Sequence, residues 1–216
     1  MRAKTVPIRV VSYNIHRAIG VDRRFHPERI VEILRHHDAD LVLLQEVDEG
    51  APRSREMDLG TELARILGYG HVAVGHNVTL RRGRYGNATL SRFPIERERN
   101  IDLTVGGRKR RGCQHTRVRV PEAVGPDRVL DVFNLHLGLL AKEREHQVRL
   151  LSRASEFTAL RQADACVVGG DFNDWRALLR PILTGELAFR CVTPGENGHR
   201  RAFRTSPSFS PQGALD

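Results

Sequence analysis

Cysteine, aromatic residues and long apolar runs are all scarce in this sequence. Only three of its 216 residues are cysteines, and no two of them have the spacing of a disulfide framework or of a metal-binding motif. No apolar run approaches the roughly 20 residues that span a bilayer. No apolar signal core precedes the first expected strand. These absences argue against a disulfide-stapled secreted domain and a helical membrane protein, so we expect a cytoplasmic monomer.

Lysine is scarce too, and the net charge of +9 comes almost entirely from arginine. A basic surface for a polyanion or an anionic membrane would explain this charge, and so would a general compositional preference for arginine. The arginines are scattered, apart from one dense cluster at 108–111. Aromatic residues make up 6% of the chain and are not interleaved with basic ones. This pattern argues against the stacking platforms of proteins that bind single-stranded nucleic acid.

The remaining composition is typical of a globular protein, and the length suits a single domain over residues 1–216. We expect strands at 6–14, 40–46, 70–75, 87–91, 96–104, 112–120, 128–135 and 165–169, and helices at 27–38, 59–67, 141–161 and 175–183. We expect a basic loop at 76–85 and irregular structure at 193–213. Strands and helices alternate at both ends of the chain around a mainly β middle, which predicts two packed sheets flanked by helices.

Four of the expected strands lead into a polar residue that suits a metal or a phosphate: Asn14, Glu46, His136 and Asp171. If these strands are neighbours in one twisted layer, their ends converge, and ligand crevices form at strand ends. Such a set of side chains favours a hard divalent cation and a phosphate. The plainer alternatives are a solvated loop glutamate at Glu46, a turn residue at Asn14 and a core histidine at His136.

The segment VVGGDFNDW, at 167–175, is the sharpest local signal. Asp171 and Asn173 face the same way if the chain there is extended, so together they could orient a water and hold a phosphoryl group. The alternative is a polar helix cap, a role that suits Asp174. Asn87 is either a turn residue or a pocket-lining amide, and Arg111 could clamp a phosphate.

Together these motifs resemble the endonuclease/exonuclease/phosphatase superfamily, whose members are four-layered α/β sandwiches of two packed mixed β-sheets flanked by helices. The matching segments are SYNIH (12–16), LVLLQEV (41–47), GNATLSRFPI (86–95), FNLHLG (133–138), GGDFNDW (169–175) and ALD (214–216). The resemblance implies metal-dependent hydrolysis of phosphate esters, by a phosphodiesterase such as a nuclease or by a phosphatase. It implies nucleic acid, a phospholipid head group or a small phosphoester as substrate.

The resemblance also implies a role for each site residue. Glu46 would bind Mg²⁺ or Mn²⁺ with Asn14 beside it, and His136 would contact the scissile phosphate. Asp171 would position or deprotonate the attacking water, and Asn173 would stabilise the phosphoryl group. The last residue in the sequence, Asp216, matches a late aspartate of the family and would support the site.

The sequence departs from the family pattern at its C-terminal end, where a Ser-Asp-His segment is expected and the sequence ends at Asp216. We therefore expect a domain that is incomplete at this end. The alternative function is a catalytically impaired domain of the same fold that binds polyanions.

Overall fold

Eight strands form two four-stranded sheets. The structure is a computed structural model, and it describes residues 7–121, 128–161 and 164–192. The first sheet has the spatial order β1 (Val10–Asn14), β2 (Leu41–Glu49), β4 (Arg84–Ser91) and β3 (His71–Thr79). The second has the order β5 (Ile95–Asp102), β6 (Gly112–Val120), β7 (Arg128–His136) and β8 (Ala165–Asp171). The pairs β1–β2 and β7–β8 are parallel and the others antiparallel, so both sheets are mixed.

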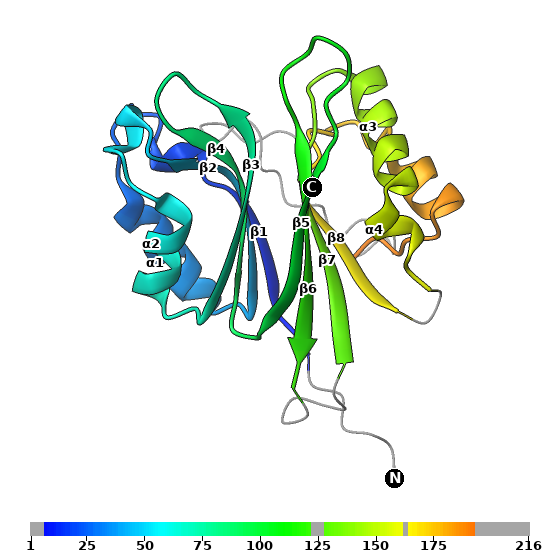
Figure 1. The fold of residues 1–216 in the computed structure, drawn as a ribbon, viewed down its shortest axis with the longest axis horizontal. Coiled ribbons are helices and arrows are strands. Elements are labelled where there is room, and N and C mark those ends of the chain that lie inside the picture. Colours follow the sequence, from blue (N-terminus) through cyan, green and yellow to red (C-terminus); the bar gives the residue numbers. More distant parts are fainter. Residues whose placement is uncertain (1–6, 122–127, 162–163, 193–216) are drawn as a thin grey trace.

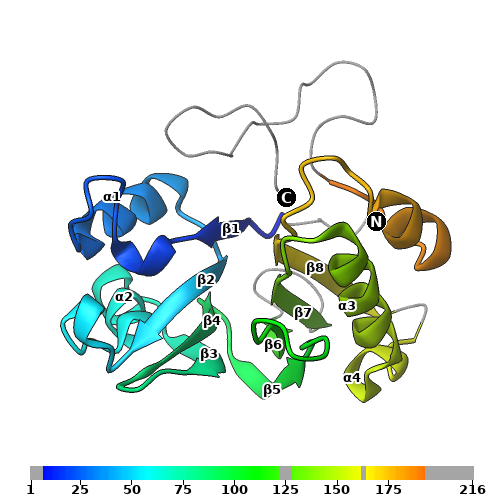
Figure 2. The ribbon, with the colours of Figure 1, turned by 90° about the horizontal axis from the view of Figure 1, so that it is seen from above.

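The two sheets pack against each other, and helices cover their outer faces (Figure 1). Helices α1 (Pro27–His37) and α2 (Leu59–Leu67) cover the first sheet, and α3 (Ala141–Arg153) and α4 (Ser155–Thr158) cover the second. Viewed from above, β1 and β8 lie next to each other at the junction of the sheets (Figure 2). The predicted four-layered α/β sandwich is therefore confirmed. None of the helices described is long and apolar enough to cross a membrane.

Helix α2 illustrates how local sequence signals set the elements. Asp58 caps its first turn, because the Asp58 carboxylate accepts a hydrogen bond from Thr61 N. Gly68 ends the helix in the left-handed region, with φ of 75°. Between these two signals, Leu59 and Leu63 turn fully buried side chains toward the first sheet. Both ends of this helix match the sequence prediction.

The space between the sheets is apolar at one end and filled with amides at the other. Leu41 and Leu43 of β2 pack against residues of β6 and β7. Further along, Asn134 of β7 donates hydrogen bonds from Nδ2 to the carbonyl oxygens of Leu44 (3.1 Å) and Ala88 (3.0 Å). Its Oδ1 accepts one from Gln45 Nε2 at 2.8 Å. These bonds cross from one sheet to the other and fix the strands whose ends carry the polar residues.

Several sequence-based boundaries are wrong. The segment 76–85 is mostly strand, because β3 continues to Thr79 and β4 begins at Arg84. The helix expected at 141–161 breaks at Ala154, whose ψ is 145°. The helix expected at 175–183 is replaced by turns and a π-helix at Pro181–Glu186, and Asp174 Oδ2 accepts a hydrogen bond from Leu179 N. The irregular segment expected at 193–213 lies outside the described residues.

Candidate active site at the strand ends

Asp171 is the centre of a buried cluster at the end of β8. Its Oδ2 accepts a hydrogen bond from Asn14 Nδ2 at 2.8 Å, and His136 Nε2 lies 3.6 Å from the same oxygen. Its Oδ1 accepts a hydrogen bond from Asn173 N at 2.9 Å. Strands β1, β7 and β8 thus bring their ends together, as the sequence predicted. Residues 157 positions apart in the chain share one hydrogen bond here.

Asn173 reaches this cluster by a sharp turn of the chain. Its φ is 52°, in the left-handed region that asparagine tolerates better than most residues. The chain is therefore not extended at Asn173, which was the condition for Asp171 and Asn173 to face the same way. The turn aims the Asn173 main-chain N–H at Asp171, and the side-chain Nδ2 donates to Leu137 O at 2.9 Å. An amide NH₂ has two N–H groups, so a second one remains to meet a ligand.

Glu46 lies within β2 rather than at its end. The register of β2 against β4 shifts between Leu44 and Val47, which marks a β-bulge, and Glu46 has a φ of 56°. The bulge puts two residues, Gln45 and Glu46, opposite Asn87 of β4, so Gln45 hydrogen-bonds to Asn134 between the sheets while Glu46 lies near His16, Arg17 and His136. The sequence could not reveal this, because β2 reads as an uninterrupted apolar run up to Gln45.

Positive charge surrounds the Glu46 carboxylate. Arg17 Nε lies 3.3 Å and His16 Nδ1 3.8 Å from Glu46 Oε2. Burial alone would raise the pKa of Glu46, but His16, Arg17 and His136 together lower that pKa to about 2. Glu46 is therefore ionised at neutral pH. His16 lies in a short helical turn, and both His16 and Arg17 have positive φ values.

His136 is buried at the end of β7 and stays neutral at neutral pH. Burial lowers the pKa of its imidazole, and the Arg111 guanidinium lowers it further. Asp171 and Glu46 act in the opposite direction, and the resulting pKa is about 4. His136 is buried, as a core histidine would be, but its neighbours are ionisable groups and not only apolar side chains. A neutral imidazole has one N–H donor and one acceptor to offer a substrate.

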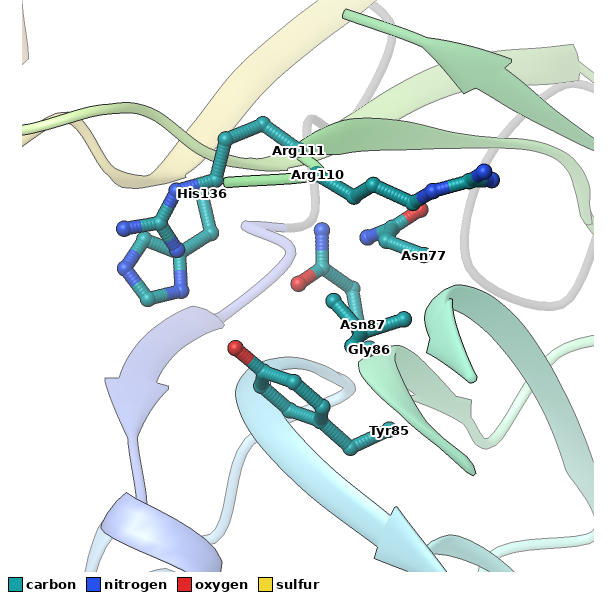
Figure 3. Close-up of a pocket in the computed structure, with 8 residues that line it drawn as sticks. Asn77, Tyr85, Gly86, Asn87, Arg110, Arg111 and His136 are labelled. Carbon is teal, nitrogen blue, oxygen red and sulfur yellow. The ribbon is translucent and has the colours of Figure 1, made fainter. Parts of the chain in front are cut away.

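Asn87 and Arg111 line a small pocket beside His136, together with Tyr85 and Arg110 (Figure 3). The Asn87 amide nitrogen donates to Asn134 O at 3.0 Å and to Gly112 O at 3.3 Å, and its oxygen points to the His136 side of the pocket. Arg111 is only 7% exposed, and its Nε has no hydrogen-bond partner among the described residues. A buried guanidinium N–H without a partner is suited to a phosphate oxygen.

Sequence reasoning missed the aromatic residue of this pocket, Tyr85. Arg53 and Lys109 lie against its ring, at 5.3 Å and 5.5 Å from the centroid. Arg53 is held there by two 2.8 Å hydrogen bonds to the fully buried Asp48. Lys109 and Arg110 are both exposed; the first lies over the Tyr85 ring and the second lines the pocket. No local pattern indicates this contact, because it joins segments that lie far apart in the sequence.

The donor set fits a hard, partly hydrated cation. The buried Glu46 Oε2 has no hydrogen-bond partner in the described part of the chain, and Asn14 Oδ1 accepts only from His16 N among the bonds found. Mg²⁺ commonly takes one or two protein oxygens and completes its shell with water and phosphate. Residues 7–121, 128–161 and 164–192 contain no group of three His, Cys, Asp or Glu side chains that could hold a metal by themselves.

The structure thus brings Asn14, Glu46, His136, Asp171 and Asn173 to one place, with Asn87 and Arg111 in the adjoining pocket. One predicted site residue, Asp216, lies outside the described residues.

Comparison with known proteins supports one family over nearly the whole chain. A family model described as "Endonuclease/Exonuclease/phosphatase family" matches residues 11–215. The Escherichia coli K12 protein YbhP, described as uncharacterised, is 35% identical and is matched over 96% of this chain and 82% of its own length. A solved endonuclease/exonuclease/phosphatase from Beutenbergia cavernae is 25% identical, with a TM-score of 0.64. That match covers 78% of this chain and 48% of the other, so this chain spans about half of its length.

A more distant structure shares the fold alone. D. rerio TDP2, solved in complex with a single-strand DNA product, is 15% identical with a TM-score of 0.59. The match covers 81% of this chain and 64% of the TDP2 chain.

Proposed function

The chain belongs to the endonuclease/exonuclease/phosphatase family, and we propose that it hydrolyses phosphate esters with the help of Mg²⁺ or Mn²⁺. The observation that carries this proposal is the cluster around Asp171, where Asn14 and His136 meet one carboxylate oxygen. Hydrolysis of a phosphate ester requires mostly positioning and neutralisation of charge. The carboxylate, amide and imidazole groups of this cluster suit both tasks.

Asp171 is the group that handles the attacking water. Asn14 Nδ2 and Asn173 N each hold one of its oxygens, which fixes the direction of the remaining lone pairs. In that position Asp171 orients the water and accepts its proton as the water oxygen bonds to phosphorus. The ester P–O bond opposite the water breaks, and the leaving alcohol takes up a proton.

Three side chains hold the phosphoryl group, and two hold the cation. Neutral His136 donates one hydrogen bond to a non-bridging oxygen, and Arg111 Nε supplies a charge-assisted one. The second N–H of Asn173 serves the oxygens that gain charge in the transition state. Glu46, ionised and with no hydrogen bond to its Oε2 from the described residues, would hold the cation together with Asn14. When bound, this cation supplies Lewis-acid stabilisation of the phosphoryl oxygens.

We propose a phosphodiester in a polyanion, such as nucleic acid, as the substrate class. Basic side chains continue beyond the pocket, since Arg110 lines it and both Arg53 and Lys109 lie on Tyr85. A substrate with several phosphates would meet these charges, whereas an isolated phosphate would use only the first. Binding of a polyanion to them should weaken steeply with salt, because each phosphate contact releases counterions. A shallow dependence on salt would favour a lipid head group or another small phosphoester.

The test of the activity uses bis(p-nitrophenyl) phosphate. We expect Mg²⁺-dependent release of p-nitrophenol from the wild type and a loss of about 10²-fold or more in Asp171→Ala. The matched control is Asp164→Ala, which removes a carboxylate near the opposite end of β8 and should retain the wild-type rate. Equal rates in the wild type and Asp171→Ala would refute the proposal. Binding of a polyanion by the wild type without turnover would support the non-catalytic alternative.

A further inference from the structure

A second cavity lies on the outer face of the second sheet, beneath α4 and the turn that follows it. It has a volume of about 260 Å³. It opens where the covering helix breaks at Ala154, so that only the short α4 overlies this end of the sheet. Asp131 in its wall lies five residues before His136 on β7, or about 17 Å along an extended strand. The cavity is therefore separate from the site around Asp171.

A buried histidine with one unpaired ring nitrogen lines this cavity. His115 is 4% exposed, and its Nε2 lies 2.7 Å from Asp131 Oδ1. The carboxylate occupies Nε2, which leaves Nδ1 as the second ring nitrogen that needs a hydrogen-bond partner. This Nδ1 has no hydrogen-bond partner in the described part of the chain. The ring is stacked on Phe133 with a centroid distance of 4.5 Å, which keeps its orientation fixed.

Because His115 Nδ1 is buried, we expect it to have a hydrogen-bond partner. Buried polar groups in proteins are almost always hydrogen-bonded, and an exception indicates a ligand or an ordered water. An imidazole lone pair held by a carboxylate on the other ring nitrogen is also a common metal ligand. No group of three metal-binding side chains occurs among the residues described, so a metal site is not supported. A hydroxyl group, which can donate to Nδ1, is the simpler partner.

Two arginines in the cavity wall are able to bind an anion. Its carboxylates have partners within the protein: Asp131 pairs with His115, Glu156 accepts from Ser155 Oγ at 3.0 Å, and Asp164 pairs with Arg161 at 3.0 Å. The wall also contains Arg97 and Arg117, which act on Glu156 and Asp164 through longer-range coulombic attraction. Neither guanidinium makes a hydrogen bond or a close ion pair within the described part of the chain, so both keep N–H groups that can donate to an anionic ligand.

We propose that this cavity binds a small hydroxylated anion, with its carboxylate or phosphate on Arg97 and Arg117 and a hydroxyl group on His115 Nδ1. The volume leaves room for a molecule of metabolite size and is several times that of one water, about 30 Å³. Two kinds of anion share this chemistry, and two probes separate them. L-malate presents carboxylates and a hydroxyl, and glycerol 2-phosphate presents a phosphate and hydroxyls.

Titration calorimetry tests the proposal, in buffer that contains EDTA to remove divalent cations. The Asp171→Ala variant is titrated in parallel, so that binding at the active site can be distinguished from binding at this cavity. We expect at least one probe to bind both proteins with equal affinity at concentrations up to about 10 mM. Arg117→Ala, a change at the half-buried rim of the cavity, should weaken binding about tenfold or more. The matched control is Arg99→Ala on the same strand face of β5 as Arg97, which does not line the cavity and should leave the affinity unchanged.

The imidazole ¹⁵N resonances give a second readout at the histidine itself. The imidazole signal that is absent from the spectrum of His115→Gln belongs to His115. In the wild type, the Nδ1 resonance of His115 should shift when the probe binds. The proposal is overturned if neither probe binds, if Arg117→Ala binds as the wild type does, or if Arg99→Ala is weakened equally. Loss of binding in Asp171→Ala alone would move the ligand to the active site and would also overturn it.

Discussion

Replacing Asn134 by leucine tests how the two sheets are held in register beneath the active site. Asn134 has no solvent exposure, and its side chain donates to two backbone carbonyls of the opposite sheet, Leu44 O and Ala88 O. It also accepts a hydrogen bond from Gln45 Nε2. Leucine is close in size, so the change removes these three bonds without opening a large cavity.

The expected loss follows from counting the groups that are left without a partner. The two carbonyl oxygens lose a donor, and a buried polar group without a partner costs about 1–3 kcal/mol. Gln45 Nε2 keeps its hydrogen bond to Leu43 O at 3.0 Å, so the loss of its bond to Asn134 costs less free energy. We expect the free energy of unfolding to fall by about 2–5 kcal/mol, which lowers Tm by about 5–15 °C for a chain of this length.

Thermal unfolding followed by circular dichroism, with urea titration for the free energy, measures this effect. The control is Asn100→Leu, because Asn100 Nδ2 also joins the two sheets through His76 O (2.9 Å) but is exposed, so water can replace its bonds. Its change should lie within about 0.5 kcal/mol of the wild type. The reasoning is refuted if Asn134→Leu loses no more stability than Asn100→Leu.

Three further predictions concern the site and its supports. Asn14→Leu removes the hydrogen bond that orients Asp171, so kcat should fall about 10–100-fold while the fold is retained; an unchanged kcat would contradict this role. Gly170→Ala should lower the free energy of unfolding, measured by urea titration, by about 2–4 kcal/mol, because Gly170 has a φ of 135° and an added Cβ would overlap Leu135 O. The control is Gly70→Ala, whose Cβ would enter open space and should change the free energy of unfolding little. Because the pKa of His136 is near 4 when folded and near 6.5 when unfolded, the unfolded chain binds more protons between these values. Without metal, stability should therefore fall by about 3 kcal/mol as the pH drops from 7 to 4, and His136→Asn should flatten this dependence.

The sequence predicted correctly those elements whose bounds are set by local signals. Strand β6 has the predicted bounds of Gly112–Val120, and α2 has those of Leu59–Leu67, because the Gly68 stop needs no distant partner. The hairpin between β3 and β4 was missed because its basic residues read as loop. Pairing with β4 makes the segment up to Thr79 a strand, which is a contact that periodicity does not show.

The sequence by itself determined the strand-end residues and the order of their segments, because an apolar run that stops at a polar residue is a local pattern. Only the tertiary structure decided how these residues meet. The bulge that places Glu46 near Arg17 and His136, and the junction of β1 with β8 that joins Asn14 to Asp171, depend on the pairing of strands far apart in the chain. Register and packing are set by the whole sheet, so no short segment contains them.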